Sequence, residues 1–169
     1  TQLNTYFIVV DGYGSSEGNY TFDMDWDYGC DVTCPTGSTD EGEPDCGIPT
    51  DTVNGGCNSI PNVFGSISCG ETICGTAHFD GGTRDTDWYE ITTTGATIFT
   101  LTVEAEFPAL MGKLGQYVDG VPGCDNTTGS VDPYALPGEC EVTSIVTPAL
   151  PAGTYYFFVA PQFLDTFPC

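Results

Sequence analysis

The sequence predicts an all-β protein, an antiparallel β-sandwich held by disulfides. Several short runs alternate apolar and polar residues with a period of two, as half-buried strands do, and turn residues separate them. Gly (22) and Pro (12) are frequent, whereas only two residues are Lys or Arg and two are Met, a composition that disfavours long amphipathic helices. Nine cysteines accompany a single histidine, which favours disulfides over zinc thiolates.

Residues 1–28 are predicted to form a β-hairpin. Its first strand contains the aromatic and β-branched run Thr5 to Val10. Its second strand, Tyr20 to Tyr28, alternates strictly, so one face is aromatic and the other acidic. The acidic face carries Asp23, Asp25 and Asp27.

The first strand of this hairpin resembles a run near the other end of the chain. Thr5 to Val10 reads TYFIVV and Thr154 to Val159 reads TYYFFV, at a spacing of about one domain. We therefore expect tandem domains, in which the hairpin is equivalent to the last strands of a preceding or neighbouring sandwich. The second sandwich is expected to lack its final strand, and an unpaired sheet edge is a template for a strand from another chain.

Residues 29–65 are predicted to be a linker, rich in Cys, Gly and Pro and without apolar periodicity. Neighbouring cysteines suggest three pairs, although spacing alone cannot fix connectivity. These pairs are Cys46 with Cys57, Cys69 with Cys74, and Cys124 with Cys140. The odd count leaves Cys169 as a candidate for a bond beyond this segment.

Residues 66–169 are predicted to form the sandwich itself. The clearest strand is Ile98 to Phe107, because its alternate residues are apolar and should face the core. Those residues are Phe99, Leu101, Val103, Ala105 and Phe107. Further strands are expected at Ile67 to Gly75, from Trp88, at Val142 to Thr147 and at Thr154 to Ala160.

The formal net charge of -22 excludes two classes of partner. It repels nucleic acid and anionic lipid, and no apolar run is long enough for membrane insertion. It attracts divalent cations. The disulfides predict a secreted, extracellular protein, and two sequons, at Asn19 and Asn126, are candidate glycosylation sites.

An acidic loop is the candidate metal site. Asp80, Asp85 and Asp87 lie in one glycine-containing stretch with Glu90 close behind, and carboxylate oxygens suit Ca²⁺. The alternative is that these aspartates hydrogen-bond the backbone amides of a turn that precedes the Trp88 strand. Catalysis is not expected. His78 is the sole histidine, and no Gly-x-Ser-x-Gly motif surrounds a serine.

Three motifs together resemble the bacterial pre-peptidase C-terminal domain. They are Gly75-Thr76, Asp85-Thr86-Asp87-Trp88-Tyr89, and Leu150-Pro151-Ala152-Gly153-Thr154-Tyr155 with the strand that follows. The resemblance implies a secreted, jelly-roll-like β-sandwich that accompanies exported enzymes or repeats in large surface proteins. Some members bind Ca²⁺ or polymeric substrates. The many cysteines resemble a tandem-repeat variant from large exported bacterial proteins.

These observations favour a non-catalytic structural protein on the bacterial cell surface, a repeating unit of a filament, surface layer or adhesive stalk. Its partners would be neighbouring subunits or repeats, joined by strand donation. The alternative is an accessory module of a secreted enzyme that binds extracellular protein or polysaccharide. A hairpin that folds back on its own chain would remove the main support for the structural hypothesis.

Overall fold

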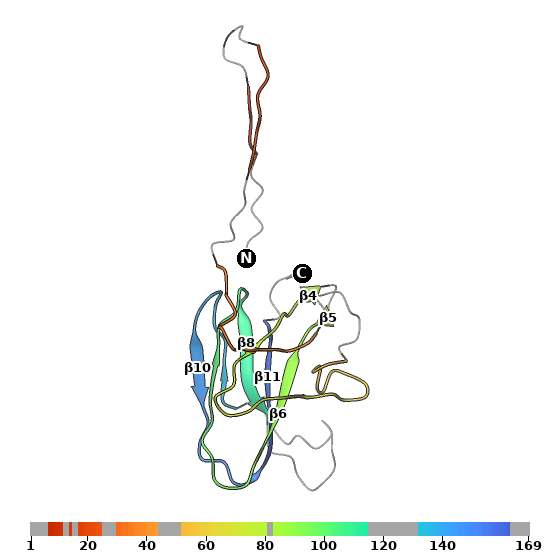
Figure 1. The fold of residues 1–169 in the computed structure, drawn as a ribbon, viewed down its shortest axis with the longest axis vertical. Coiled ribbons are helices and arrows are strands. Elements are labelled where there is room, and N and C mark those ends of the chain that lie inside the picture. The colour runs from red at the N-terminus through yellow and green to blue at the C-terminus, as the bar shows by residue number, and fades with distance from the viewer. Residues whose placement is uncertain are drawn as a thin grey trace.

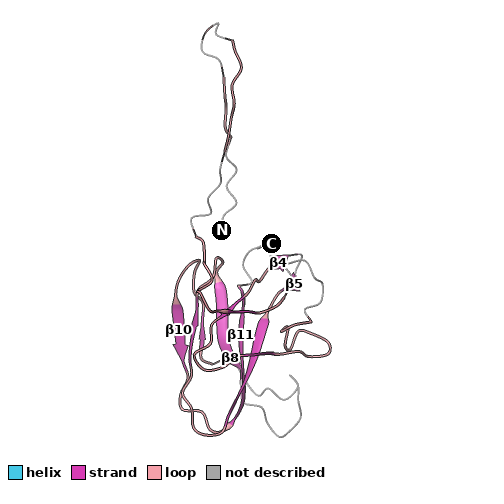
Figure 2. Cartoon of the chain, viewed as in Figure 1, coloured by secondary structure: helices cyan, strands magenta, loops and turns pink. Residues whose placement is uncertain are grey.

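The computed structural model describes residues 7–11, 14, 17–24, 30–43, 52–80, 83–114 and 132–162. Within these ranges the chain is all-β and contains no helix, which confirms the predicted class (Figure 1, Figure 2). The strands are β1 (Thr39–Asp40), β2 (Gly65–Ser66), β3 (Ile73–Cys74), β4 (Phe79–Asp80), β5 (Thr83–Arg84), β6 (Asp87–Thr93), β7 (Thr100–Val103), β8 (Ala109–Leu114), β9 (Tyr134–Ala135), β10 (Thr143–Val146) and β11 (Gly153–Pro161).

A five-stranded sheet in the order β2-β6-β11-β8-β9 forms the main layer. Its central strand, β11, is antiparallel to β6 and β8, with Phe158 opposite Trp88 on one side and Gly112 on the other. The short β2 is parallel to β6. Because β11 has a hydrogen-bonded neighbour on each side, its run of aromatic residues occupies the middle of the sheet.

Strands β7 and β10 form a second, two-stranded antiparallel layer in which Leu101 lies opposite Ile145. Alternate residues of this layer face inward, as the sequence predicted for Phe99 and Leu101. Phe99 is buried and Leu101 is half-buried. Two shorter pairs complete the fold, β1 with β3 in parallel and β4 with β5 antiparallel.

The core consists of two clusters that contain alternate residues of β11. Tyr155 and Phe157 pack with Phe99 and Leu150. Tyr156 and Phe158 pack with Trp88, and the partly buried Cys57 and Phe64 lie against that cluster. Neighbouring residues of a strand point to opposite faces, so both faces of β11 are covered. Part of the segment predicted to be a linker therefore packs against the core.

Two disulfides connect distant parts of the chain, Cys30 with Cys140 and Cys34 with Cys74. The predicted Cys69–Cys74 and Cys124–Cys140 pairs are therefore wrong. Cys69 is free and exposed. Cys57 is also disulfide-bonded, but Cys46, Cys124 and Cys169 lie outside the described residues, so the predicted Cys46–Cys57 pair stays a prediction.

The tertiary pairing of strands explains the observed connectivity. β1 runs parallel to β3 with Asp40 opposite Cys74. In the turn just before β1 the Ser38 amide donates to the Pro35 carbonyl at 3.0 Å, and this reversal returns Cys34 to Cys74 at the end of β3. The Cys140 amide donates to the Ala105 carbonyl at 2.7 Å. The Val32 amide donates to the neighbouring Glu106 carboxylate at 2.9 Å, so Cys30 reaches the same end of β7.

The disulfides indicate an oxidising, extracellular setting. In the part of the chain that the structure describes, no helix has the length and apolar character needed to cross a membrane.

Candidate functional site

The most unusual surface is an exposed N-terminal segment that extends far from the sheets (Figure 1). We call residues 7–11 and 17–24 the arm; Figure 1 shows them at the opposite end of the molecule from the sheets. Large apolar side chains in it are open to solvent: Phe7 is 89% exposed, Tyr20 70% and Phe22 55%. Contiguous exposed apolar surface of this kind is typical of an interaction site.

The two parts of the arm have different patterns. In Phe7–Val10 every residue is large, apolar and exposed, so both faces of an extended chain would be apolar there. In residues 20–24 the apolar Tyr20, Phe22 and Met24 alternate with Thr21 and Asp23. The first part suits a strand buried on both faces, as β11 is, and the second suits a strand at the surface of a sandwich.

The two-stranded sheet of β7 and β10 has an open edge along β7. Thr97 and Leu150 exchange two backbone hydrogen bonds of 2.9 and 2.8 Å, and the Thr147 amide donates to the Phe99 carbonyl at 2.9 Å. Odd-numbered residues of this strand therefore direct their backbone groups toward β10.

Because these directions alternate along an antiparallel strand, Ile98, Thr100 and Thr102 direct their backbone groups to the opposite side. Among the described strands, none pairs with β7 there. We call this row of backbone N–H and C=O groups the free edge of β7. It can form hydrogen bonds with one further strand.

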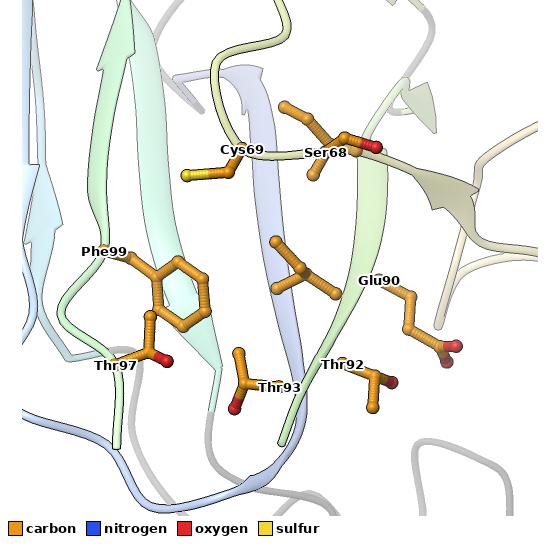
Figure 3. A pocket seen from close by; sticks show the side chains of 9 residues that line it. Ser68, Cys69, Glu90, Thr92, Thr93, Thr97 and Phe99 are labelled. Carbon is orange, nitrogen blue, oxygen red and sulfur yellow. The ribbon is translucent and has the colours of Figure 1, made fainter. Parts of the chain in front are cut away.

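A pocket of about 360 Å³ adjoins this edge, between β6 and the residues that lead into β7 (Figure 3). Its apolar lining includes Ile67, Ile91 and Phe99, and the free thiol of Cys69 also lines it. The remaining lining residues are polar: Ser68, Glu90, Thr92, Thr93 and Thr97. The volume is within the range of ligand pockets and is sufficient for large side chains.

A cluster of three carboxylates is the candidate cation centre. Carboxylate oxygens of Glu41, Glu43 and Asp87 all lie within 4.8 Å of one another, and Asp87 is buried. Asn54 donates to one oxygen of Glu41 at 3.3 Å, and the Thr76 amide donates to the other at 2.5 Å. These hydrogen bonds hold the Glu41 carboxylate beside Asp87.

The electrostatics of the neighbouring tyrosine reflect this concentration of negative charge. Burial raises the pKa of Tyr89 well above its usual range, and the charges of Asp87 and Glu41 raise it further. A phenolate next to two carboxylates would be costly, so Tyr89 stays protonated and contributes a neutral hydroxyl to the cluster. That hydroxyl accepts a 3.5 Å hydrogen bond from Asn54.

Of the predicted metal residues, the three whose side chains the structure describes do not form one carboxylate cluster. Asp87 belongs to the cluster with Glu41 and Glu43. The carboxylate of Asp85 instead lies 3.5 Å from Nδ1 of His78, a contact that is an ion pair when the histidine is protonated. Glu90 is exposed on β6 and lines the pocket. The backbone of Asp80 belongs to β4, and its side chain is outside the described part.

Glu41 and Glu43 were not among the predicted metal residues, because they belong to the segment predicted to be a linker. The local run Asp40-Glu41-Gly42-Glu43 was the available signal. Of the two sequons, Asn19 is exposed on the arm and Asn126 lies outside the described residues.

Comparison of the chain with protein-family models, with curated proteins and with solved structures found no match.

Proposed function

We propose that this protein is a non-catalytic extracellular structural protein, a repeating β-sandwich unit of a filament, surface layer or adhesive stalk on the bacterial cell surface. Units join by strand donation, in which the arm of one unit enters the sandwich of the next. The observation that carries this proposal is the arm itself, with Phe7, Tyr20 and Phe22 exposed far from their own sandwich.

Energetics favour burial of the arm in a partner. Burying a Phe or Met side chain contributes roughly 1.5–3 kcal/mol to the free energy of association. A pair of aromatic rings contributes about 0.5–1.5 kcal/mol beyond the effect of its buried area. Seven large apolar side chains of the arm are exposed: Phe7, Ile8, Val9, Val10, Tyr20, Phe22 and Met24. In strand donation the arm of one unit binds a different surface of the next unit, so the contact is head-to-tail. Such contacts build an open filament unless the rotation from one unit to the next closes a ring.

The net charge of -22 makes two units repel each other, so the proposed assembly requires bound cations to reduce this repulsion. Ca²⁺ bound at Glu41, Glu43 and Asp87 would lower the repulsion within and between units. The proposed jelly-roll-like, pre-peptidase C-terminal type of sandwich agrees with the central position of β11, whose sequence the first part of the arm resembles.

Sedimentation of the full chain in buffer with Ca²⁺ and moderate salt tests the proposal. The wild type should form concentration-dependent assemblies, whereas Phe22→Asp should sediment as a monomer because it places a charge on the apolar face of the arm. Thr21→Asp is the matched control, since it adds the same charge to the opposite face one residue away. It should still assemble. A wild type that remains monomeric at all concentrations, or equal assembly of both variants, would refute arm-mediated association.

A further inference from the structure

We propose that the free edge of β7 is the acceptor, and that it receives residues 20–24 of the arm of a second copy of this chain. The inference rests on the proposed function and adds the surface where one unit receives the next. It follows from three features: the alternation in the arm, the direction of the backbone groups in β7, and the pocket next to that edge.

The apolar face of residues 20–24 matches the inward face of β7. Tyr20, Phe22 and Met24 occupy every second position of a five-residue strand. The inward residues of the acceptor, Phe99, Leu101 and Val103, are spaced in the same way and are buried or half-buried. A strand added in plane with β7 places its own alternate side chains between the two layers, beside these residues.

The polar face matches as well. Thr21 and Asp23 would lie outward, next to Thr100 and Thr102, which are exposed and uncharged. Like charges directly opposite one another destabilise a strand pair, and this pairing avoids them despite the acidic character of the chain. The added strand would extend the two-stranded layer by one strand and cover the unpaired backbone groups.

The first part of the arm does not suit this position. Phe7–Val10 is apolar on both faces, and the outward face of β7 is exposed to solvent, so one of its apolar faces would stay wet. Residues 20–24 leave only a threonine and an aspartate outside. The edge therefore selects the second part of the arm over the first.

The pocket supplies room for the entering side chains. It lies at the same edge, with Phe99, Ile91 and Ile67 as apolar lining. Figure 3 shows Phe99 on one side of the pocket and Cys69 above it, with the strand of Glu90 and Thr92 on the other side. An aromatic residue of the arm placed there would cover the thiol of Cys69, which is exposed in the single chain.

A second copy is a better donor than the chain's own arm. Cys30 is tied to Cys140, whose amide binds Ala105 just beyond β7, and only five residues separate Met24 from Cys30. Cys30 therefore lies near the C-terminal end of β7. If the arm of the same chain folded back onto β7, Met24 would lie near that end and Tyr20 near the other, so the arm would run parallel to β7. An arm from a second copy is free to pair antiparallel, the slightly more stable arrangement. The arm also extends away from its own sheets in Figure 1.

Thr100→Pro in the full chain tests the acceptor edge. Proline is tolerated where a strand's N–H faces the open side, so the single chain should keep its β-sheet circular dichroism and unfolding temperature. The amide that would bond the incoming strand is lost, and association measured by sedimentation should weaken by about tenfold or more. If the variant assembles as the wild type does, the acceptor edge is wrong and strand donation can still stand. If the wild type does not assemble, the proposed function fails.

Cross-linking between two differently labelled chains provides a second readout that does not depend on the proline variant folding. In a Cys69→Ser background, Thr21→Cys chains are mixed with Thr100→Cys chains and oxidised mildly. We expect a mixed disulfide dimer on a non-reducing gel, and much less with Ser144→Cys, which is exposed one strand farther from the edge. Equal yields at the two positions would overturn the inference. A double Thr21→Cys, Thr100→Cys chain that closes on itself as a monomer would show that the arm folds back, and would overturn it as well.

Discussion

The indole of Trp88 stacks on the ring of Phe158, with ring centroids 5.1 Å apart and the planes inclined by 29°. Trp88 belongs to β6 and Phe158 to β11, in register with each other. The pair links the centre of the main sheet to residues 52–64, because Gly56 and Phe64 contact the same tryptophan.

Phe158→Ala should lower the free energy of unfolding by about 3–5 kcal/mol, because it removes a buried ring from a packed cluster and leaves a cavity. Urea denaturation followed by fluorescence measures this change. Val142→Ala is the control, since Val142 is 64% exposed, and its effect should stay within about 0.5 kcal/mol. Equal losses in the two variants would mean that the Trp88 cluster is not part of the core.

Gly56→Ala should destabilise the fold through two separate effects. Gly56 has a φ of +51°, which disfavours any side chain, and a Cβ at this position would collide with the Trp88 ring. Gly70→Ala separates these effects, because Gly70 has a φ of +82° and open space around it. We expect a loss of about 1–2 kcal/mol for Gly70→Ala, and a further 1–3 kcal/mol, roughly, for Gly56→Ala from overpacking. A smaller loss at Gly56 than at Gly70 would contradict the packing of residues 52–64 on Trp88.

The Cys30–Cys140 and Cys34–Cys74 disulfides should contribute unequally to stability. The Cys30–Cys140 bond spans a separation of 110 residues and the Cys34–Cys74 bond one of 40. In the chain-entropy model a loop of about 100 residues gives about 4.7 kcal/mol, and one of about 40 gives roughly 4 kcal/mol. Replacing Cys30 and Cys140 together by Ser should therefore cost more than replacing Cys34 and Cys74. Thermal unfolding of the two double variants measures the order, and a reversed order would contradict it.

Ca²⁺ should raise the unfolding temperature of the wild type, because a ligand that binds only the folded state stabilises it by mass action. Glu43→Gln should reduce this shift, since Glu43 belongs to the carboxylate cluster with Glu41 and Asp87. Glu90→Gln is the matched control. It removes one carboxylate from the exposed side of β6 and should leave the shift intact. A shift lost in Glu90→Gln and kept in Glu43→Gln would place the cation elsewhere.

The strands with clear alternation could be predicted from the sequence. In residues 98–107 the period of two indicated which side chains face inward, and in residues 154–160 the aromatic run indicated a strand, because buried strand positions are occupied by apolar residues. The central place of that strand in the sheet was not predicted; it follows from the pairing of β11 with both β6 and β8. Residues 52–64 carried no such pattern. Their buried positions include Asn54 and Ser59, and Ser59 is satisfied by hydrogen bonds to Gly56 and Val63 rather than by apolar packing.

The candidate cation centre and the disulfides could be predicted only in part. Asp87 was among the predicted residues, but Glu41 and Glu43 come close to it through contacts between distant segments, which no local spacing encodes. β1 pairs with β3, and Asn54 hydrogen-bonds both Glu41 and the amide of Trp88, the residue next to Asp87. For the same reason Cys74 pairs with Cys34 rather than with the nearby Cys69. Contacts between distant segments depend on the tertiary fold, and a single sequence gives no direct signal for them.

Electron microscopy of the native protein in Ca²⁺-containing buffer, and again after addition of a chelator, distinguishes a strand-donated polymer from isolated units. Strand donation by the arm predicts ordered filaments or sheets with one sandwich per repeat, loosened when the chelator removes the cations that offset the charge of -22. Single compact particles in both buffers would contradict assembly by strand donation.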